Sequence, residues 1–212
     1  MRPRTLDHVA LWVADRERMV AIAIERLGIR VIERTDRFTL LGADARRGKL
    51  TLFDAEGPRE RGALARIGLR VSSLDGRDAQ VDLGEGLEIA LVEAETDSEL
   101  DLDYVALQSS DPGAAAAGWE KLGFERTADG RLELGGAQLE LVPGDPGAPE
   151  RPLLNHIGVL VDSVAEHQAA AEELGVEIDD VVDAPNTIAL FVWGPDRVKL
   201  EYVEHKPSFS LT

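Results

Sequence analysis

One short strand-like phrase recurs along this chain and constrains its fold more than any other feature. The copies read LDHVALWV at residues 6–13, LDYVALQ at 102–108, LNHIGVLV at 154–161 and, more weakly, ARIGLRV at 65–71. Their starts are separated by about 50 residues or a multiple of that, a period typical of repeated supersecondary units. The chain is therefore predicted to consist of four related modules.

Each complete module has the same predicted order of elements: strand, helix, strand, strand, strand. In the first module, Asp15 follows the strand at 6–13 as a helix N-cap, and Gly28 ends the helix. Three short apolar or β-branched stretches follow, at 29–33, 38–42 and 49–53. Residues 102–142 and 154–203 repeat this order.

The second module is shorter than the other three. Only residues 73–86 separate its first strand from its last strand at 87–93, which is too little chain for a helix and two strands. The interval is predicted to form a short helix at 74–81. We therefore predict an α+β fold of four βαβββ-type modules, the second truncated, and divide the chain into an N-terminal half, 1–97, and a C-terminal half, 98–212.

Composition excludes several classes of partner. The chain has 212 residues, with 23 Lys and Arg against 40 Asp and Glu, for a net charge of -17. Such a charge argues against binding nucleic acid or an anionic membrane surface. There is no cysteine, so disulfides and thiolate ligands are excluded, and no apolar run resembles a signal or membrane segment. We expect a cytoplasmic protein whose partners are neither nucleic acid nor membrane.

The modular pattern resembles the vicinal oxygen chelate superfamily, which includes glyoxalase I, extradiol dioxygenases and bleomycin resistance proteins. The resemblance covers nearly all of residues 5–204 and is best at 6–9, 154–157 and 194–202. It implies two domains of curved mixed β-sheet with flanking helices, each built from two modules. Relatives often form homodimers, but four modules in one chain can form two complete cups, the concave sites between paired modules. The resemblance therefore leaves open whether this protein is a homodimer.

The resemblance also implies a ligand set, because the first strand of a module offers a His and the last strand a Glu. In modules one to four, the residue at the ligand position of the first strand is His8, Ile67, Tyr104 and His156, respectively. The residue at the ligand position of the last strand is Thr51, Ala90, Glu140 and Glu201. The predicted metal ligands are therefore His8, His156 and Glu201. Two histidines and one carboxylate form a facial triad suited to Fe(II), and also to Mn, Ni, Co or Zn.

Two pairings of modules are compatible with this resemblance. If modules three and four pair, the cup contains Tyr104 and Glu140 beside His156 and Glu201. If modules one and four pair, His8, His156 and Glu201 meet, with Thr51 as the fourth neighbour. The second pairing brings all the conventional ligands together, so we favour it.

Two main classes of function stay open, beside a third possibility, an auxiliary domain whose site has decayed as the second module has. The first is a metal-dependent enzyme, either a glyoxalase-type lyase or isomerase or an extradiol-type dioxygenase, that binds two neighbouring substrate oxygens by Lewis-acid chelation. This chain departs from both kinds of enzyme. Extradiol dioxygenases usually have a Tyr near the position of Phe191, and glyoxalase I has a fourth metal ligand where this chain has Thr51 or Tyr104. The second is a metal-free binding or sequestering protein of the bleomycin-resistance type, its cup lined by aromatic side chains: Trp12, Phe38, Phe53, Phe191, Trp193 and Tyr202.

The other two histidines have plain predictions. His167 lies among charged residues of the last helix and is expected at the surface. His205 follows the last strand and is expected in a C-terminal tail.

Overall fold

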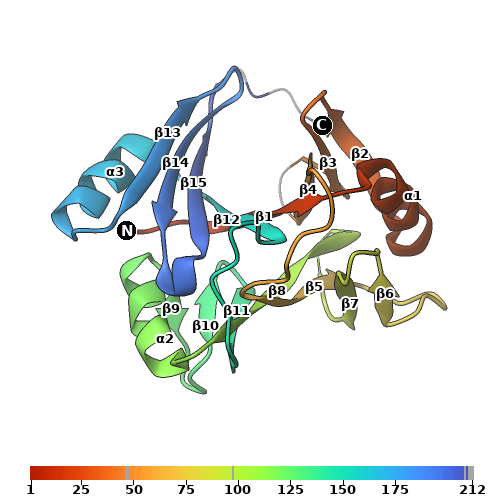
Figure 1. The fold of residues 1–212 in the computed structure, drawn as a ribbon, viewed down its shortest axis with the longest axis horizontal. Helices are drawn as coiled ribbons and strands as arrows, with labels where there is room; N and C mark the ends of the chain where they lie inside the picture. The colour runs from red at the N-terminus through yellow and green to blue at the C-terminus, as the bar shows by residue number, and fades with distance from the viewer. Residues whose placement is uncertain (46–47, 97, 208, 210–212) are drawn as a thin grey trace.

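In the computed structural model, two stacked mixed β-sheets form the body of the protein (Figure 1). The structure describes residues 1–45, 48–96, 98–207 and 209. Within these ranges one sheet has eight strands, in the order β13-β14-β15-β12-β1-β4-β3-β2, and the other has seven, in the order β6-β7-β5-β8-β11-β10-β9. The predicted α+β architecture is confirmed.

The first and fourth modules build the eight-stranded sheet. The first comprises β1 (Thr5–Val13), α1 (Arg16–Leu27), β2 (Arg30–Arg34), β3 (Phe38–Gly42) and β4 (Lys49–Asp54). The fourth comprises β12 (Leu154–Leu160), α3 (Val164–Glu173), β13 (Ile178–Asp183), β14 (Thr187–Trp193), the 3-10 turn η1 (Pro195–Arg197) and β15 (Lys199–His205). Strands β1 and β12 join the two modules as an antiparallel pair, and the two halves of the sheet rise on either side of them (Figure 1).

The second and third modules build the seven-stranded sheet. The second comprises β5 (Leu64–Val71), β6 (Gln80–Asp82) and β7 (Glu88–Glu93); the third comprises β8 (Leu100–Ser109), α2 (Pro112–Lys121), β9 (Glu125–Arg126), β10 (Leu132–Leu134) and β11 (Ala137–Pro143). Strands β5 and β8 are their antiparallel junction. The truncated module thus lacks a helix within its described residues.

The predicted short helix at 74–81 is wrong. Residues 72–79 form turns and bends, and residues 80 and 81 belong to β6. Asp75 and Gly76 both have positive φ, 50° and 80°, which a right-handed helix cannot accommodate.

The favoured pairing of modules one and four is confirmed. The two sheets therefore do not coincide with the predicted halves of the chain, 1–97 and 98–212. Each sheet contains one module from residues 1–97 and one from residues 98–212. Residue 97 itself lies outside the described ranges. Each sheet combines both halves because β1 pairs with β12 of the fourth module, and not with a strand of the second module.

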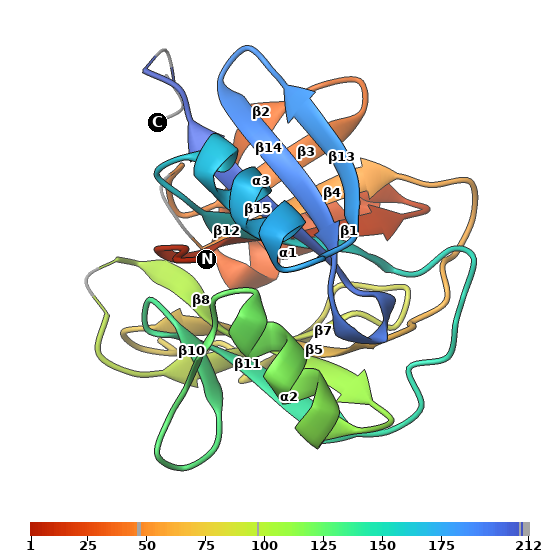
Figure 2. The same ribbon diagram turned by 90° about the vertical axis from the view of Figure 1, so that its left-hand side faces the viewer.

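Helix boundaries follow the predicted capping residues. Asp15 accepts a hydrogen bond from the Arg18 backbone N–H, and Gly28 ends α1 in the left-handed conformation, φ 75°. Asp111 caps α2 in the same way, with Pro112 as its first residue. Figure 2 shows α3 beside the eight-stranded sheet and α2 beside the seven-stranded sheet. None of the helices in the described ranges is long and apolar enough to cross a membrane.

One hydrophobic core connects the two sheets. The central strands of both contribute fully buried side chains to it, including Val9, Ile157, Ile67 and Val105. Alternation along a strand places neighbours of these residues on the opposite face. On β1 and β12 that opposite face is the concave one, and it carries His8 and His156.

His167 and His205 both differ from their predicted roles. His167 is buried, because its Nε2 accepts the Arg2 backbone N–H while its Nδ1–H donates to the Ser163 carbonyl. It thereby fastens the N-terminal segment to α3. His205 is the last residue of β15, and its Nε2 lies 3.9 Å from Asp7 Oδ1.

Candidate metal centre

Three potential ligands from three adjacent strands meet on the concave face of the eight-stranded sheet. His8 Nε2 lies 2.9 Å from His156 Nε2 and 3.0 Å from Glu201 Oε2. His156 Nε2 lies 2.9 Å from the same carboxylate oxygen. The side chains come from β1, β12 and β15, and all three residues are less than one-tenth exposed. The residues predicted as ligands therefore converge.

Strand register explains this convergence. Ala10 on β1 is paired with His156, and His8 is paired with Gly158 two residues further along β12. On the other side of β12, Gly158 is paired with Glu201 of β15. His8 and Glu201 thus lie on either side of a glycine, and the imidazole of His8 occupies the space above it.

A buried ion pair supports His8 from behind. Asp7 Oδ2 accepts a hydrogen bond from His8 Nδ1–H at 2.8 Å. The other oxygen, Oδ1, lies 2.9 Å from Lys49 Nζ, which also donates to the Ala45 carbonyl at 3.0 Å. Asp7 and Lys49 are almost completely buried. This contact leaves Nε2 of His8 facing the cluster and fixes the orientation of the ring.

The support behind His156 is neutral. Its Nδ1–H donates to Asn155 Oδ1 at 3.0 Å. With the proton on Nδ1, the lone pair of Nε2 points toward His8 and Glu201. The two histidines therefore differ, since a carboxylate holds one and an amide holds the other.

The pKa shifts agree with this asymmetry. Burial by itself would lower the pKa of His8, but the charges and hydrogen bonds of Glu201 and Asp7 outweigh burial and raise it to about 9. For His156, burial prevails and lowers the pKa. Burial would raise the pKa of Glu201, but the two imidazoles hold it well below its usual range. Without a metal at pH 7, an imidazolium at His8 faces the Glu201 carboxylate and a neutral His156.

The spacing of the three atoms fits coordination of one ion. Two ligands at right angles around a metal, each with a bond of about 2.1 Å, lie about 3.0 Å apart. The observed separations are 2.9, 2.9 and 3.0 Å, so the atoms form a nearly equilateral triangle like one face of an octahedron. The donors, two imidazoles and one carboxylate, are those that Fe(II) and similar divalent ions accept.

Aromatic side chains surround the cluster on the same face. The ring of Phe191 on β14 lies 5.2 Å from that of His156, and the ring of Phe53 on β4 lies 6.4 Å from it. Both phenylalanines are half-buried. They give the cluster an apolar rim that limits access of water.

The seven-stranded sheet holds the equivalent positions without the two histidines. Tyr104 lies opposite Gly68 as His8 lies opposite Gly158, and Glu140 lies beside Ala106. Because modules three and four do not pair, Tyr104 and Glu140 are on the other sheet from His156 and Glu201.

One residue assignment in the second module was wrong by a position. Arg66 lies opposite Ala106 as His156 lies opposite Ala10, whereas Ile67 points into the core and is fully buried. The register shift near Arg66 does not explain the error, because the β1–β12 ladder has the same shift beside His156. The copy of the phrase in β5 begins at Leu64 rather than Ala65, which places Arg66 at its third position.

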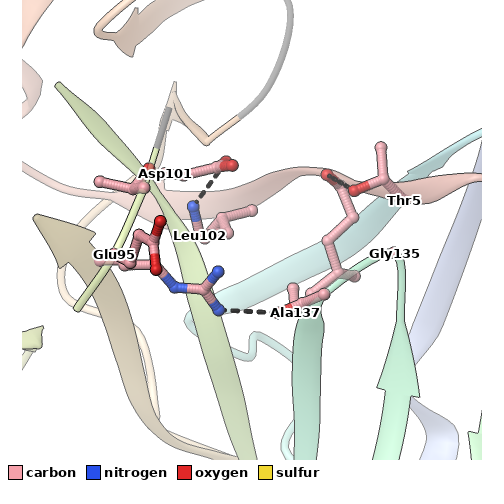
Figure 3. A pocket seen from close by; sticks show the side chains of 10 residues that line it. Thr5, Glu95, Asp101, Leu102, Gly135 and Ala137 are labelled. Atoms are coloured by element: carbon pink, nitrogen blue, oxygen red, sulfur yellow. Dashed lines mark hydrogen bonds between the residues drawn. The ribbon is translucent and has the colours of Figure 1, made fainter. Parts of the chain in front are cut away.

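A polar cleft of about 240 Å³ lies elsewhere, where the two sheets meet (Figure 3). Thr5 and Leu6 of β1 line it together with Arg70, Glu95 and Asp101. The Arg70 guanidinium in this cleft donates to Asp103 and to the Gly136 carbonyl. Its hydrogen bonds join strands of the seven-stranded sheet, which indicates a structural role.

Comparison with solved structures identifies the fold. No protein-family model and no curated protein matches the sequence. A presumed dioxygenase from Bacillus subtilis superposes with a TM-score of 0.77 at 15% identity, covering 97% of this chain and 86% of that one. Glyoxalase I from Zea mays gives 0.71 at 18%, covering 94% and 92%, and the cppA protein of Streptococcus pneumoniae gives 0.60 at 14%, covering 96% and 98%. The chain therefore has the fold of the vicinal oxygen chelate superfamily, as its repeats predicted.

Proposed function

We propose that this protein is a metal-dependent enzyme that acts on a small molecule with two neighbouring oxygen atoms. The observation that carries the proposal is the triangle of His8 Nε2, His156 Nε2 and Glu201 Oε2, with sides of 2.9 to 3.0 Å. A divalent ion bound there would act as a Lewis acid toward substrate oxygens. Three protein ligands would leave positions for two such oxygens.

The surrounding residues prepare the site for this chemistry. Asp7 and Asn155 fix the two imidazoles through their Nδ1 atoms, so that both Nε2 atoms face Glu201. The apolar rings of Phe53 and Phe191 limit the approach of water, which strengthens electrostatic interactions at the cluster. Phe191 carries no hydroxyl, so a proton must reach the substrate from another group. This favours a glyoxalase-type isomerisation or lyase reaction over ring cleavage that depends on a tyrosine at that place.

A second candidate is a metal-free binding protein whose cup holds an apolar ligand. This candidate is supported by the buried charges, because the His8 imidazolium and Lys49 neutralise the carboxylates of Glu201 and Asp7. The buried charges are therefore balanced without a metal ion. The half-buried aromatic rim would then be the binding surface.

Metal binding separates the two candidates. Protein purified without a polyhistidine tag, stripped with EDTA and titrated with Co²⁺ or Mn²⁺ in a calorimeter should bind one ion per chain. His156→Ala and Glu201→Gln should each weaken binding by at least about a hundredfold, through loss of a ligand. Glu140→Gln, at the equivalent position of the other sheet, is the matched control and should bind as the parent does. If His156→Ala and Glu201→Gln both bind the ion as tightly as the parent, the triad is excluded as the metal site.

A further inference from the structure

A row of aromatic side chains extends from the metal centre across the concave face. Trp12 on β1 is paired in register with Phe53 on β4, which is paired with Phe38 on β3. Their ring centroids are 5.2 and 5.5 Å apart, and Phe53 also contacts His156. All three rings are half-buried, so part of each faces solvent. The row offers an apolar surface that begins at the ligands.

At the end of this row, the guanidinium of Arg59 lies over the Trp12 ring, 5.5 Å from its centroid. Arg59 belongs to the loop that connects β4 to β5. Its Nε is shielded from solvent and has no hydrogen-bond partner. The contact with the indole restrains the side chain but satisfies none of its N–H groups.

Arg59 differs from comparable cations of the protein. Among the half-buried arginines of the described ranges, Arg16, Arg70 and Arg77 each make hydrogen bonds or ion pairs, whereas Arg59 makes neither there. The indole of Trp193 offers a direct comparison, because two cations, Arg197 and Lys199, lie over its ring. Those are paired with acids in addition: Lys199 with Asp179 and Arg197 with Glu177, each at 2.7 Å.

The missing partner is informative in so acidic a chain. With 40 Asp and Glu against 23 Lys and Arg, carboxylates are plentiful. Shielding a guanidinium N–H without a partner costs free energy, which a bound anion would recover. A guanidinium presents paired N–H groups that match a carboxylate, and a ring beneath it helps to hold it in place.

We propose that Arg59 is the specificity-determining residue of the metal centre and binds a carboxylate of the substrate. The substrate is then a small oxyacid, with vicinal oxygens toward His8, His156 and Glu201 and a flat or apolar body along Phe53 and Trp12. This inference rests on the proposed function, because it uses the same cup.

A pair of probes that differ only in the carboxylate tests it. Catechol and 3,4-dihydroxybenzoate are titrated calorimetrically into Co²⁺-loaded and into EDTA-treated protein. The parent should bind 3,4-dihydroxybenzoate at least about tenfold more tightly than catechol, as expected for a charge-assisted hydrogen-bonded pair. Arg59→Gln should abolish this preference without changing catechol binding or the Co²⁺ affinity. Arg18→Gln removes an exposed arginine of α1 and should keep the preference.

The outcomes separate this inference from the proposed function. Equal binding of the two probes by the parent, binding of neither, or an unchanged preference in Arg59→Gln overturns the role of Arg59. If the Co²⁺ titration depends on His156 and Glu201 while the carboxylate preference is absent, only this inference fails. If EDTA-treated protein shows the Arg59-dependent preference but no ion binds, the carboxylate site stands and the metal-dependent function fails. Circular dichroism of both variants verifies that they are folded.

Discussion

Gly158 lies directly beneath the imidazole of His8. A Cβ placed on Gly158 would be 2.3 Å from His8 Cε1 and 2.4 Å from Nδ1, closer than side-chain atoms can approach. The seven-stranded sheet repeats the relationship, because a Cβ on Gly68 would be 2.2 Å from the Tyr104 ring. In both sheets a ring from one central strand crosses a glycine of its partner. The candidate metal centre and the equivalent face of the seven-stranded sheet therefore share the same backbone arrangement.

Gly158→Ala should displace His8 from the cluster. The added methyl group forces the ring away from Glu201 and should weaken Co²⁺ binding by at least about tenfold, at a cost in stability of about 1–3 kcal/mol. Gly68→Ala is the matched control, since it produces the same clash around Tyr104. It should lower the free energy of unfolding similarly and leave the Co²⁺ affinity unchanged. Equal metal affinities of the two variants would contradict the role given to Gly158.

Asp7→Asn should weaken metal binding through His8. The carboxylate holds Nδ1 of His8 and also neutralises Lys49, which is buried beside it. Loss of an outer partner of a ligand typically costs about 10–100-fold in metal affinity. An unpaired buried ammonium should also destabilise the fold by about 3–5 kcal/mol. Asn155→Ala removes only a neutral contact of His156 and should cost less in both calorimetric affinity and urea unfolding, so the reverse order would argue against this asymmetry.

Most of the architecture could be predicted from the repeated phrase. Three complete copies fix the strand-helix-strand order, and Asp15, Gly28 and Asp111 mark helix ends by local chemistry that needs no tertiary information. The second module was harder to predict. Its interval is too short for a helix and two strands, and the short helix predicted at 74–81 failed because the positive φ at Asp75 and Gly76 is a property of the folded loop.

The candidate metal centre could be predicted only in part. His8, His156 and Glu201 were found because equivalent strands place them in equivalent register. Asp7 and Lys49 were missed, since charged residues on strands usually face solvent, and here they bury each other's charge. Arg59 was missed as well, because a loop residue has no place in the repeat. Arg66 was missed because this weak copy of the phrase begins at Leu64, one residue before the start assigned from its sequence.

Metal uptake should depend on pH through His8. Because its pKa is raised to about 9, the ring is protonated at pH 7 and must lose that proton when its Nε2 binds an ion. His156 has a lowered pKa and is already neutral. The Co²⁺ affinity should therefore fall by up to about tenfold for each unit of pH below 9. Titrations at pH 7 in two buffers of different ionisation enthalpy should detect release of about one proton per ion, and no release would contradict the assignment.

The metal-free protein should lose stability as pH rises from 6.5 to 9. The pKa of His8 is about 9 when folded and near 6.5 when unfolded, so the folded state holds the proton more tightly. Its contribution is complete below pH 6.5 and is lost as pH rises through 9, by up to about 3 kcal/mol. His156 and His205 have lowered pKa values and titrate below this window.

Urea unfolding in EDTA at pH 6.5, 7.5 and 9 measures this loss directly. His8→Gln has no titrating group at that place, so its free energy of unfolding should stay nearly constant over the same range. Saturating Co²⁺ should reverse the slope for the parent, because a bound ion replaces the proton and binds more tightly at high pH. A parent protein whose stability in EDTA is flat or rises toward pH 9 would show that the Glu201 and Asp7 carboxylates do not hold a proton on His8.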